Sequence, residues 1–521
     1  MSWRSTRAAA RAGEQTRQVA VIDLGSNSWR LVVFMFVPGH WWRRTDELYE
    51  TVRIGAGLEA TGRLDEEAMT RGLETLAVFE RFCTAHGLPP DDVHAVATSA
   101  IRDASNQEEF LARAREASAL KVEVLSEAEE ARMGYIAAVN SSTLTDGAVL
   151  ELGGGSLQLI EVRDRRAGRS GSYGLGAVRV TEELLPNPGT ASKKDLERVR
   201  ARTRAVLKAA GWLRDAGDRL VGVGGAVRNL AAAAQREAGQ VDVGVQGFFI
   251  AAEALRDLVK LLASLPADER GEVPGIKPGR GDIILAAALT IETALEVGGF
   301  EGIETTEAGL REGVFLAREL LAGREPLFGD VREVAVRNLA IQYESDMVHV
   351  EHVARLSLQM FDSLVDGGLL EPAAGERELL WAAAMLHDVG MTISYDDHHK
   401  HSQYLIVSSE LPGFDPRERA LIAQISRYHR KGAPKLGEMT PLGREGDEQL
   451  LERCAVVLRL AEHLERGHDG SVSAARLRPN GRGVDLHLEA AGDLTLPRWS
   501  VERYGDGEMF QRVFRRRLLV G

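Results

Sequence analysis

Two spacings of apolar residues divide the chain. Over 18–145, and again over 146–328, short apolar runs typical of strands alternate with segments whose apolar residues recur every three or four positions. After 328 only the helical spacing continues, and beyond about 472 strand-like alternation returns. The pattern predicts two α/β domains at 18–145 and 146–328, an all-helical domain at 329–471 and a small α+β piece at 472–521.

The two predicted α/β halves each open with a buried strand, a short polar turn and a second strand. The first reads VAVIDLGSNSWRLVVF and the second GAVLELGGGSLQLIEV, with Asp23 or Glu151 near the end of the leading strand. Backbone N–H groups in such turns can converge on a phosphate, and a carboxylate at a strand end can hold a divalent cation. One such turn alone favours an ordinary hairpin. Its recurrence in the second half favours a ligand site.

A third glycine turn, within DRLVGVGGAVRNLAAAA, stands between a predicted strand and a helix. Two facing α/β domains, each presenting a phosphate-loop hairpin, describe the actin, sugar-kinase and heat-shock ATPase (ASKHA) superfold, and the third turn fits its nucleotide-side loop. The expected fold class is therefore α/β, with two actin-like (ribonuclease H-like) domains. An all-helical domain and a small α+β C-terminal piece would follow.

The length and composition of the chain exclude several classes of protein. At 521 residues the chain exceeds what one core usually supports, and its net charge of -13 argues against general nucleic-acid binding. No apolar run approaches the roughly 20 residues of a membrane-spanning helix, so we expect a cytoplasmic protein without membrane contact. The arginine-rich residues 1–17 predict a disordered extension. Cys83 and Cys454 provide neither a disulfide framework nor a cysteine metal site.

Further motifs occur in a fixed order. The α/β halves contain VIDLGSNSWRLVV, VATSAIRDASN, LSEAEEARMGYIAAV, LELGGGSLQLIEV and GVGGAVRNLAAA, and the later chain contains GLREGV, AAAMLHDVG, HHKHSQYLI, LPGF and RYHRKGAPKL. This ordered set resembles the exopolyphosphatase and guanosine pentaphosphate phosphohydrolase family. The resemblance covers nearly the whole chain from about residue 18.

The resemblance implies a reaction centre. Glu130, in EEAR, matches the family's catalytic glutamate, which activates water at the terminal phosphoanhydride, and Glu129 is the fallback. Without the family, the better interpretation of SEAEEAR is an acidic helix start that the helix dipole favours. Asp23 and Glu151 match acids around a divalent cation, Mg²⁺ or another.

The same resemblance implies a set of phosphate contacts. Arg102 can fork onto a phosphate, and Asn106 can brace the surrounding loop. The phosphate-binding residues implied are Ser26, Asn27, Arg102, Asn106, Gly154, Gly155, Ser156, Gly224 and Gly225.

The chain departs from the family pattern in three ways. Glu151 stands where an aspartate is usual, Leu157 and Gln158 replace a Thr-Glu pair, and Ala226 replaces a hydroxyl residue. One metal-side carboxylate and one phosphate contact are thereby missing. These departures motivate an alternative, in which the chain is a catalytically weak protein that binds polyphosphate or an alarmone and acts as a regulator.

The helical region resembles the HD metal-phosphohydrolase pattern. His349 and His352 share one predicted helix face, and a His-Asp pair follows an apolar helix. Imidazole and carboxylate ligands suit several divalent ions. The expected second metal site consists of His352, His387, Asp388, His401 and His429, with Glu462 or Glu465 where an aspartate is usual. A helical domain inherited without metal is the open alternative.

The expected activity follows from the family. It is hydrolysis that releases terminal phosphate from inorganic polyphosphate or guanosine pentaphosphate, and the sequence does not separate these substrates. A metal-dependent HD-type phosphohydrolase is a further alternative, whereas a sugar or acetate kinase is disfavoured because EEAR and AIRDASN belong to the phosphohydrolase pattern. The family also implies a homodimer.

Overall fold

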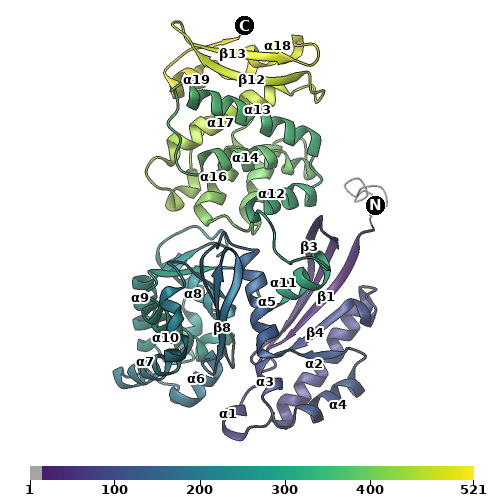
Figure 1. Ribbon diagram of the computed structural model, residues 1–521, viewed down its shortest axis with the longest axis vertical. Coiled ribbons are helices and arrows are strands. Elements are labelled where there is room, and N and C mark those ends of the chain that lie inside the picture. Colours follow the sequence, from purple (N-terminus) through teal and green to yellow (C-terminus); the bar gives the residue numbers. More distant parts are fainter. Residues whose placement is uncertain (1–14, 521) are drawn as a thin grey trace. The chain divides into compact units, whose positions relative to one another are not determined.

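A computed structural model describes residues 15–520 (Figure 1). The predicted disordered extension at 1–17 lies outside the described residues, apart from 15–17. The chain separates into two compact units, one ending at Val331 and the other beginning at Arg332. We describe each unit by itself. Among the residues that the structure describes, no helix is both long and apolar enough to cross a membrane.

The first half of the N-terminal unit contains a five-stranded sheet in the order β3-β2-β1-β4-β5. Strands β1, β2 and β3 form an antiparallel meander, while β4 and β5 run parallel to β1. Its strands are β1 (Arg17–Leu24), β2 (Trp29–Val37), β3 (Trp41–Glu50), β4 (Val93–Ala97) and β5 (Val122–Val124). Its helices are α1 (Leu58–Thr61), α2 (Glu66–Ala85), α3 (Ser99–Arg102), α4 (Gln107–Ala117) and α5 (Glu127–Val139).

The second half repeats this topology. Its sheet has the order β8-β7-β6-β9-β11, with β10 added antiparallel at the edge beside β11. The strands are β6 (Gly147–Leu152), β7 (Leu157–Arg163), β8 (Arg166–Tyr173), β9 (Leu220–Val223), β10 (Phe249–Ala251) and β11 (Gly302–Thr305). The helices are α6 (Ala177–Leu184), α7 (Lys193–Leu207), α8 (Gly225–Glu237), α9 (Ala252–Ser264), α10 (Gly281–Gly298) and α11 (Leu310–Phe315).

Helices α5 and α11 lie between the two sheets (Figure 1). One buried cluster joins Val21 of the first sheet and Val149 of the second with Ile136 of α5 and Phe315 of α11. Because α5 is buried along nearly its whole length, it lacks the polar face of a surface helix. The two sheets therefore share a core, and the first turn of α5 is held at a fixed place between them.

The C-terminal unit is a helical bundle that carries a three-stranded sheet, β12-β13-β14. The helices of the bundle are α12 (Val331–Gln342), α13 (Met347–Asp366), α14 (Glu376–Leu386), α15 (His398–Ser408), α16 (Pro416–Arg427) and α17 (Asp447–Leu464). The remaining elements are β12 (Val472–Pro479), β13 (Val484–Ala490), α18 (Thr495–Tyr504), α19 (Gly507–Phe514) and β14 (Leu518–Val520). The predicted C-terminal piece belongs to the same compact unit as the bundle.

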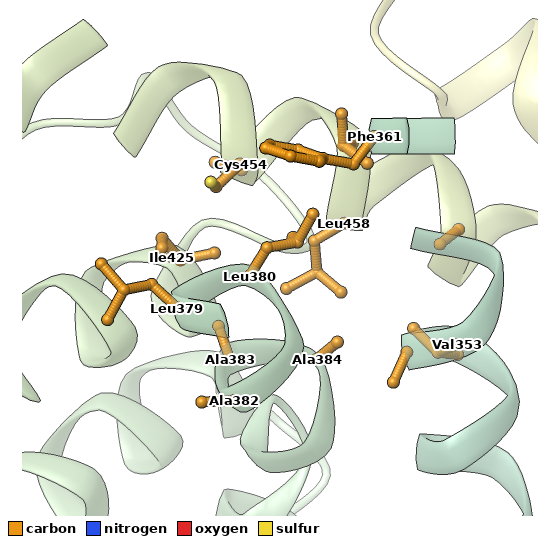
Figure 2. Close-up of a cluster of buried hydrophobic side chains, with 14 of the residues drawn as sticks. Val353, Phe361, Leu379, Leu380, Ala382, Ala383, Ala384, Ile425, Cys454 and Leu458 are labelled. Carbon is orange, nitrogen blue, oxygen red and sulfur yellow. The ribbon is translucent and has the colours of Figure 1, made fainter. Parts of the chain in front are cut away.

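The core of the bundle is built around α14. Its residues 382–384 are all alanine and fully buried, so the backbones of neighbouring helices approach closely. Figure 2 shows these alanines beside Ile425 of α16, Leu458 of α17 and Val353 of α13. The C-terminal end of α14, which leads into the His-Asp pair, is thereby fixed inside the bundle.

Candidate active site

The two hairpins that the sequence predicted have matching registers. In the first half Asp23 pairs with Arg30 across β1 and β2, and in the second Glu151 pairs with Gln158 across β6 and β7. Each acid is therefore the next-to-last residue of its strand, and a four-residue turn follows, 25–28 or 153–156. The repeat places one carboxylate at the same position in each half.

The two turns meet each other. A Cβ added to Gly154 would lie only 2.9 Å from the Cβ of Ser26, so glycine is required for this approach. The Ser26 hydroxyl lies 3.2 Å from that of Ser99, which follows β4. Turns from both halves thus border one cleft, which has a cavity volume of about 140 Å³.

Three carboxylates, those of Asp23, Glu130 and Glu151, line this cleft. Burial, as the largest cause, raises the pKa of each above its usual value, and for Glu151 well above it. Mutual repulsion adds to this effect, since Glu130 and Asp23 both raise the pKa of Glu151. A cation bound beside these carboxyl groups would stabilise their ionised form.

Glu130 is fixed by a neighbouring arginine. Nη1 of Arg102 donates to Glu130 Oε2 over 2.7 Å and to the Leu125 carbonyl over 3.1 Å. This charge-assisted contact opposes the effect of burial on the Glu130 pKa. Glu130 is only 7% exposed, so the carboxylate is both oriented and largely removed from bulk water.

Glu129, the fallback in the sequence analysis, has a structural role. Its Oε2 accepts from the backbone N–H of Ser126 over 2.9 Å and from the Ser126 hydroxyl over 2.8 Å. The Ser126 hydroxyl in turn accepts from the Glu129 backbone, which completes a capping box at the start of α5. These hydrogen bonds lower the pKa of Glu129. The side chain is not among those that line the cleft.

Glu151 extends towards α5, where a glycine leaves space for it. A Cβ on Gly134 would collide with Glu151 Oε2. The longer side chain at 151, compared with the family's aspartate, is therefore matched by the absence of a side chain at 134. Sequence reasoning did not anticipate this pairing, because the two residues are 17 positions apart and on different elements.

Four arginines bring positive charge to the cleft. Its lining includes Arg30, Arg228, Arg280 and Arg311, which come from β2, α8, the turn before α10, and α11. Burial, followed by the nearby charge of Arg311, lowers the pKa of Arg228 to about 10. Arg311 is buried and the other three are partly buried, and guanidinium groups that repel one another in such a place are stabilised by a polyanion. Sequence reasoning missed all four residues.

Several buried polar atoms at the cleft have no hydrogen-bond partner within the described part of the chain. They include the donor Asn27 Nδ2 and the acceptor Glu151 Oε2. Arg102, which binds Glu130 but is not among the residues that line the cleft, likewise has a buried Nη2 without a partner among the described residues. Buried polar groups are normally satisfied, so these atoms suit a ligand that supplies complementary groups. Oxygen donors are what a hard divalent cation prefers. The carboxylates of Asp23 and Glu151 therefore fit the cation that the family implies.

The other predicted phosphate contacts divide into two groups. Gly224 and Gly225 line the cleft, and Gly224 has φ of 114° with the Leu152 carbonyl so close that only glycine fits. Gly155 and Ser156 are not among the residues that line it. Asn106 is also absent from the lining, because both ends of its amide bind the backbone of the segment before α2, at Leu64.

Two of the residues that depart from the family pattern, Gln158 and Ala226, bring no carboxylate or hydroxyl group to the cleft. Gln158 is completely buried and donates from Nε2 to the Ser156 hydroxyl over 2.9 Å, while its Oε1 has no partner among the described residues. Ala226 lines the cleft and contributes no hydroxyl. The second half therefore brings one carboxylate, that of Glu151, to the cleft through this hairpin.

The helical unit holds a separate cluster. His387, Asp388 and His429 of the predicted set lie together, and His349 and His398 complete the group. His352 and His401 are not part of it. The Nε2 of His352 instead lies 2.8 Å from the Val472 carbonyl and 3.6 Å from Glu465. The structure therefore brings His349 and His398 into this group, each three residues before the predicted His352 and His401.

Comparisons with known proteins agree with the geometry. A model of the Ppx/GppA phosphatase family matches residues 32–322, and a model described as Ppx/GppA phosphatase, domain III, matches residues 331–496. The Aquifex aeolicus family member is 26% identical, with a TM-score of 0.50 over 58% of this chain and 97% of its own. An exopolyphosphatase from Cytophaga hutchinsonii is 23% identical, with a TM-score of 0.54 over 60% of this chain and 100% of its own. The expected actin-like α/β fold is confirmed.

Proposed function

The chain belongs to the Ppx/GppA phosphatase family, and we propose that it releases the terminal phosphate from a chain of phosphoanhydrides. The observation that carries this proposal is that one cleft is lined by three carboxylates and by four arginines. A phosphoanhydride chain needs positive charge along its length and an acid-base group at the end that is cleaved. The cleft offers both.

Glu130 acts as the general base in this account. Arg102 engages Oε2 and leaves the other carboxylate oxygen to accept a proton from water. The water oxygen then forms a bond to the terminal phosphorus, and the anhydride P–O bond breaks towards the rest of the chain. Burial supports this role, because it raises the pKa of Glu130 towards the pH at which proton transfer is most effective.

Asp23 and Glu151 would hold a divalent cation, and Mg²⁺ is the expected ion. When bound, the cation would neutralise charge on the phosphate oxygens. Ser26, Asn27 and Gly154 would contribute hydrogen-bond donors from the two turns that meet in the cleft. The arginines would bind the phosphates further along the chain.

The test is phosphate release by the purified full-length protein with Mg²⁺, using inorganic polyphosphate and guanosine pentaphosphate in parallel. We expect release from at least one of them, with polyphosphate slightly favoured. No release from either substrate would contradict the proposal. Sedimentation at low concentration would test the homodimer that the family implies.

A second candidate function is binding with little turnover, in which the chain acts as a sensor of polyphosphate or an alarmone. The amide of Gln158, buried against Ser156 where the family has a carboxylate, favours it. Restoring the family residues with Glu151→Asp and Gln158→Glu would then raise turnover strongly and leave binding unchanged. Rapid turnover by the unaltered chain would exclude this candidate.

A further inference from the structure

One arginine of the second α/β half reaches into the first half, close to the proposed general base. Arg179 lies in the first turn of α6, and its side chain is 26% exposed. We propose that Arg179 is a positioning residue for Glu130. It neutralises Asp103, and Arg102 is thereby left to bind Glu130. This inference rests on the proposed function, in which Glu130 is the general base.

The backbone of Arg179 is attached to a turn that lines the cleft. The N–H groups of Val178 and Arg179 donate to the Gly154 carbonyl over 2.9 and 3.2 Å. They belong to the first turn of α6, whose N–H groups have no acceptor within the helix. Gly176 permits this approach, because a Cβ there would collide with the backbone of Gly154. The side chain of Arg179 therefore starts from a fixed place beside the site.

The guanidinium group of Arg179 binds two carboxylates of the first half. Its Nη2 donates to Asp103 Oδ2 over 3.3 Å, and its Nε lies 3.1 Å from Glu59 Oε2. Glu182, which follows on α6, accepts from the N–H of Gly57 over 3.2 Å and makes a further contact between the halves. Arg179 therefore connects α6 both to α1 and to the end of α3.

Asp103 competes with Glu130 for Arg102. Asp103 Oδ1 lies 3.4 Å from Nε of Arg102, whereas the hydrogen bond from Arg102 to Glu130 Oε2 spans 2.7 Å. A guanidinium group between two carboxylates interacts more strongly with the one that no other cation neutralises. Because Arg179 already neutralises Asp103, Arg102 favours Glu130. Without Arg179, Arg102 would be the remaining cation paired with Asp103 in the described part of the chain.

The charge of Asp103 also acts on Glu130 directly. Burial is the largest cause of the raised pKa of Glu130, and Arg102 opposes it. The negative charges of Asp23 and Asp103 raise this pKa further. A cation beside Asp103 offsets its contribution. Arg179 therefore favours a Glu130 side chain that is both ionised and oriented.

Arg179 acts from outside the cleft. It is not among the residues that line the cleft, but it lines an adjoining hollow of about 20 Å³. Ser26, Ser99 and Gly154 line both spaces. Loss of the Arg179 side chain should therefore alter turnover rather than affinity for substrate. Partly exposed ion pairs contribute little to folding stability, so variants at this position should fold.

The change of partner can be tested without any assay of activity. Crystal structures of full-length Arg179→Met, and of the double variant Arg179→Met with Asp103→Asn, are compared with that of the wild-type protein. We expect Arg102 to turn from Glu130 to Asp103 in the single variant and to return to Glu130 in the double variant. Arg102 still bound to Glu130 in the single variant would overturn the inference. This result does not depend on the proposed function, because no turnover is measured.

Phosphate release from polyphosphate with Mg²⁺ tests the consequence for the reaction. Arg179→Met should lower kcat about 10- to 100-fold at unchanged KM, since misplacement of a reacting group affects the chemical step. Arg179→Lys, which keeps the charge, should recover part of the loss. Asp103→Asn should restore the turnover of Arg179→Met, a rescue that a merely structural role of Arg179 does not predict. Failure of this rescue, or an undiminished kcat in Arg179→Met, would overturn the inference.

Arg53→Met is the matched control. Arg53 also joins the two halves, but through Asp282, with 3.2 Å between Nη1 and Oδ2. Its kcat should equal that of the wild-type protein, and thermal unfolding of each variant identifies any that fails to fold. A loss in Arg53→Met as large as that in Arg179→Met would overturn the specific role of Arg179. Absence of phosphate release by the wild-type protein would instead contradict the proposed function, and the crystal structures would still decide the inference.

Discussion

Arg102 donates from Nη1 to Oε2 of Glu130 over 2.7 Å, and this contact joins the end of α3 to the first turn of α5. Both residues are largely buried, with side chains 15% and 9% exposed. The pair therefore fixes the carboxylate that we propose as general base and also stabilises its charge.

Replacement of Arg102 by methionine tests this relationship. Burial raises the pKa of Glu130 and Arg102 opposes that effect, so its loss raises the pKa further. Because only the ionised carboxylate accepts a proton, the acidic limb of kcat/KM should move to higher pH. A pH profile at saturating Mg²⁺ measures the shift. A variant whose activity falls equally at every pH would contradict the assigned role.

The four arginines that line the cleft should determine the affinity for substrate. Arg228→Met removes one buried cation, and loss of a charge-assisted hydrogen bond should raise KM for polyphosphate about 10- to 100-fold, with a smaller change in kcat. Steady-state kinetics at two salt concentrations measures this. Arg115→Met, on the exposed surface of α4, is the control and should change neither constant. An unchanged KM in Arg228→Met would place the substrate elsewhere.

The space beside Gly134 should determine how the cation is bound. Gly134→Ala brings a methyl group into the position of Glu151 Oε2, so the carboxylate must move. We expect the Mg²⁺ concentration for half-maximal activity to rise on the order of 10-fold. Gly211→Ala, where an added Cβ meets nothing within 4 Å, is the matched control. If the two variants need the same Mg²⁺ concentration, Glu151 is not a ligand of the cation.

The sequence predicted those parts of the site that lie in continuous segments. The two hairpins, with Asp23 and Glu151 at matching registers, follow from alternation of apolar residues and from turn chemistry. The glycine turn after β9 was recognised for the same reason. Each of these patterns lies within one short segment, so it can be recognised without knowledge of the tertiary structure.

The four arginines that line the cleft could not be predicted in this way. Arg30, Arg228, Arg280 and Arg311 come from four separate elements, and each alone is indistinguishable from a surface arginine. Arg311 lies within GLREGV, a stretch that carried the family resemblance but suggested no charge partner. Only the folding of both halves brings the four guanidinium groups together.

The histidine cluster shows a different limit of sequence reasoning. His349 and His352 are one helical turn apart, as are His398 and His401, so each pair occupies one face of its helix. The apolar pattern identifies that face but not which turn of the helix reaches the cluster. Packing of α13 against the alanine-rich α14, and of α15 against α16 and the short helix Val389–Thr392, decides it, and this packing is a tertiary property.

The central claim is that Glu130 activates the attacking water, and phosphate release by Glu130→Gln tests it most directly. The amide keeps the size of the side chain but cannot accept a proton, so turnover should fall about 10²- to 10⁴-fold while polyphosphate still binds. Glu129→Gln, which alters only the capping box, is the matched control and should retain most of the activity. Near-normal release by Glu130→Gln, together with its loss in His387→Ala, would contradict the account and assign the chemistry to the helical unit.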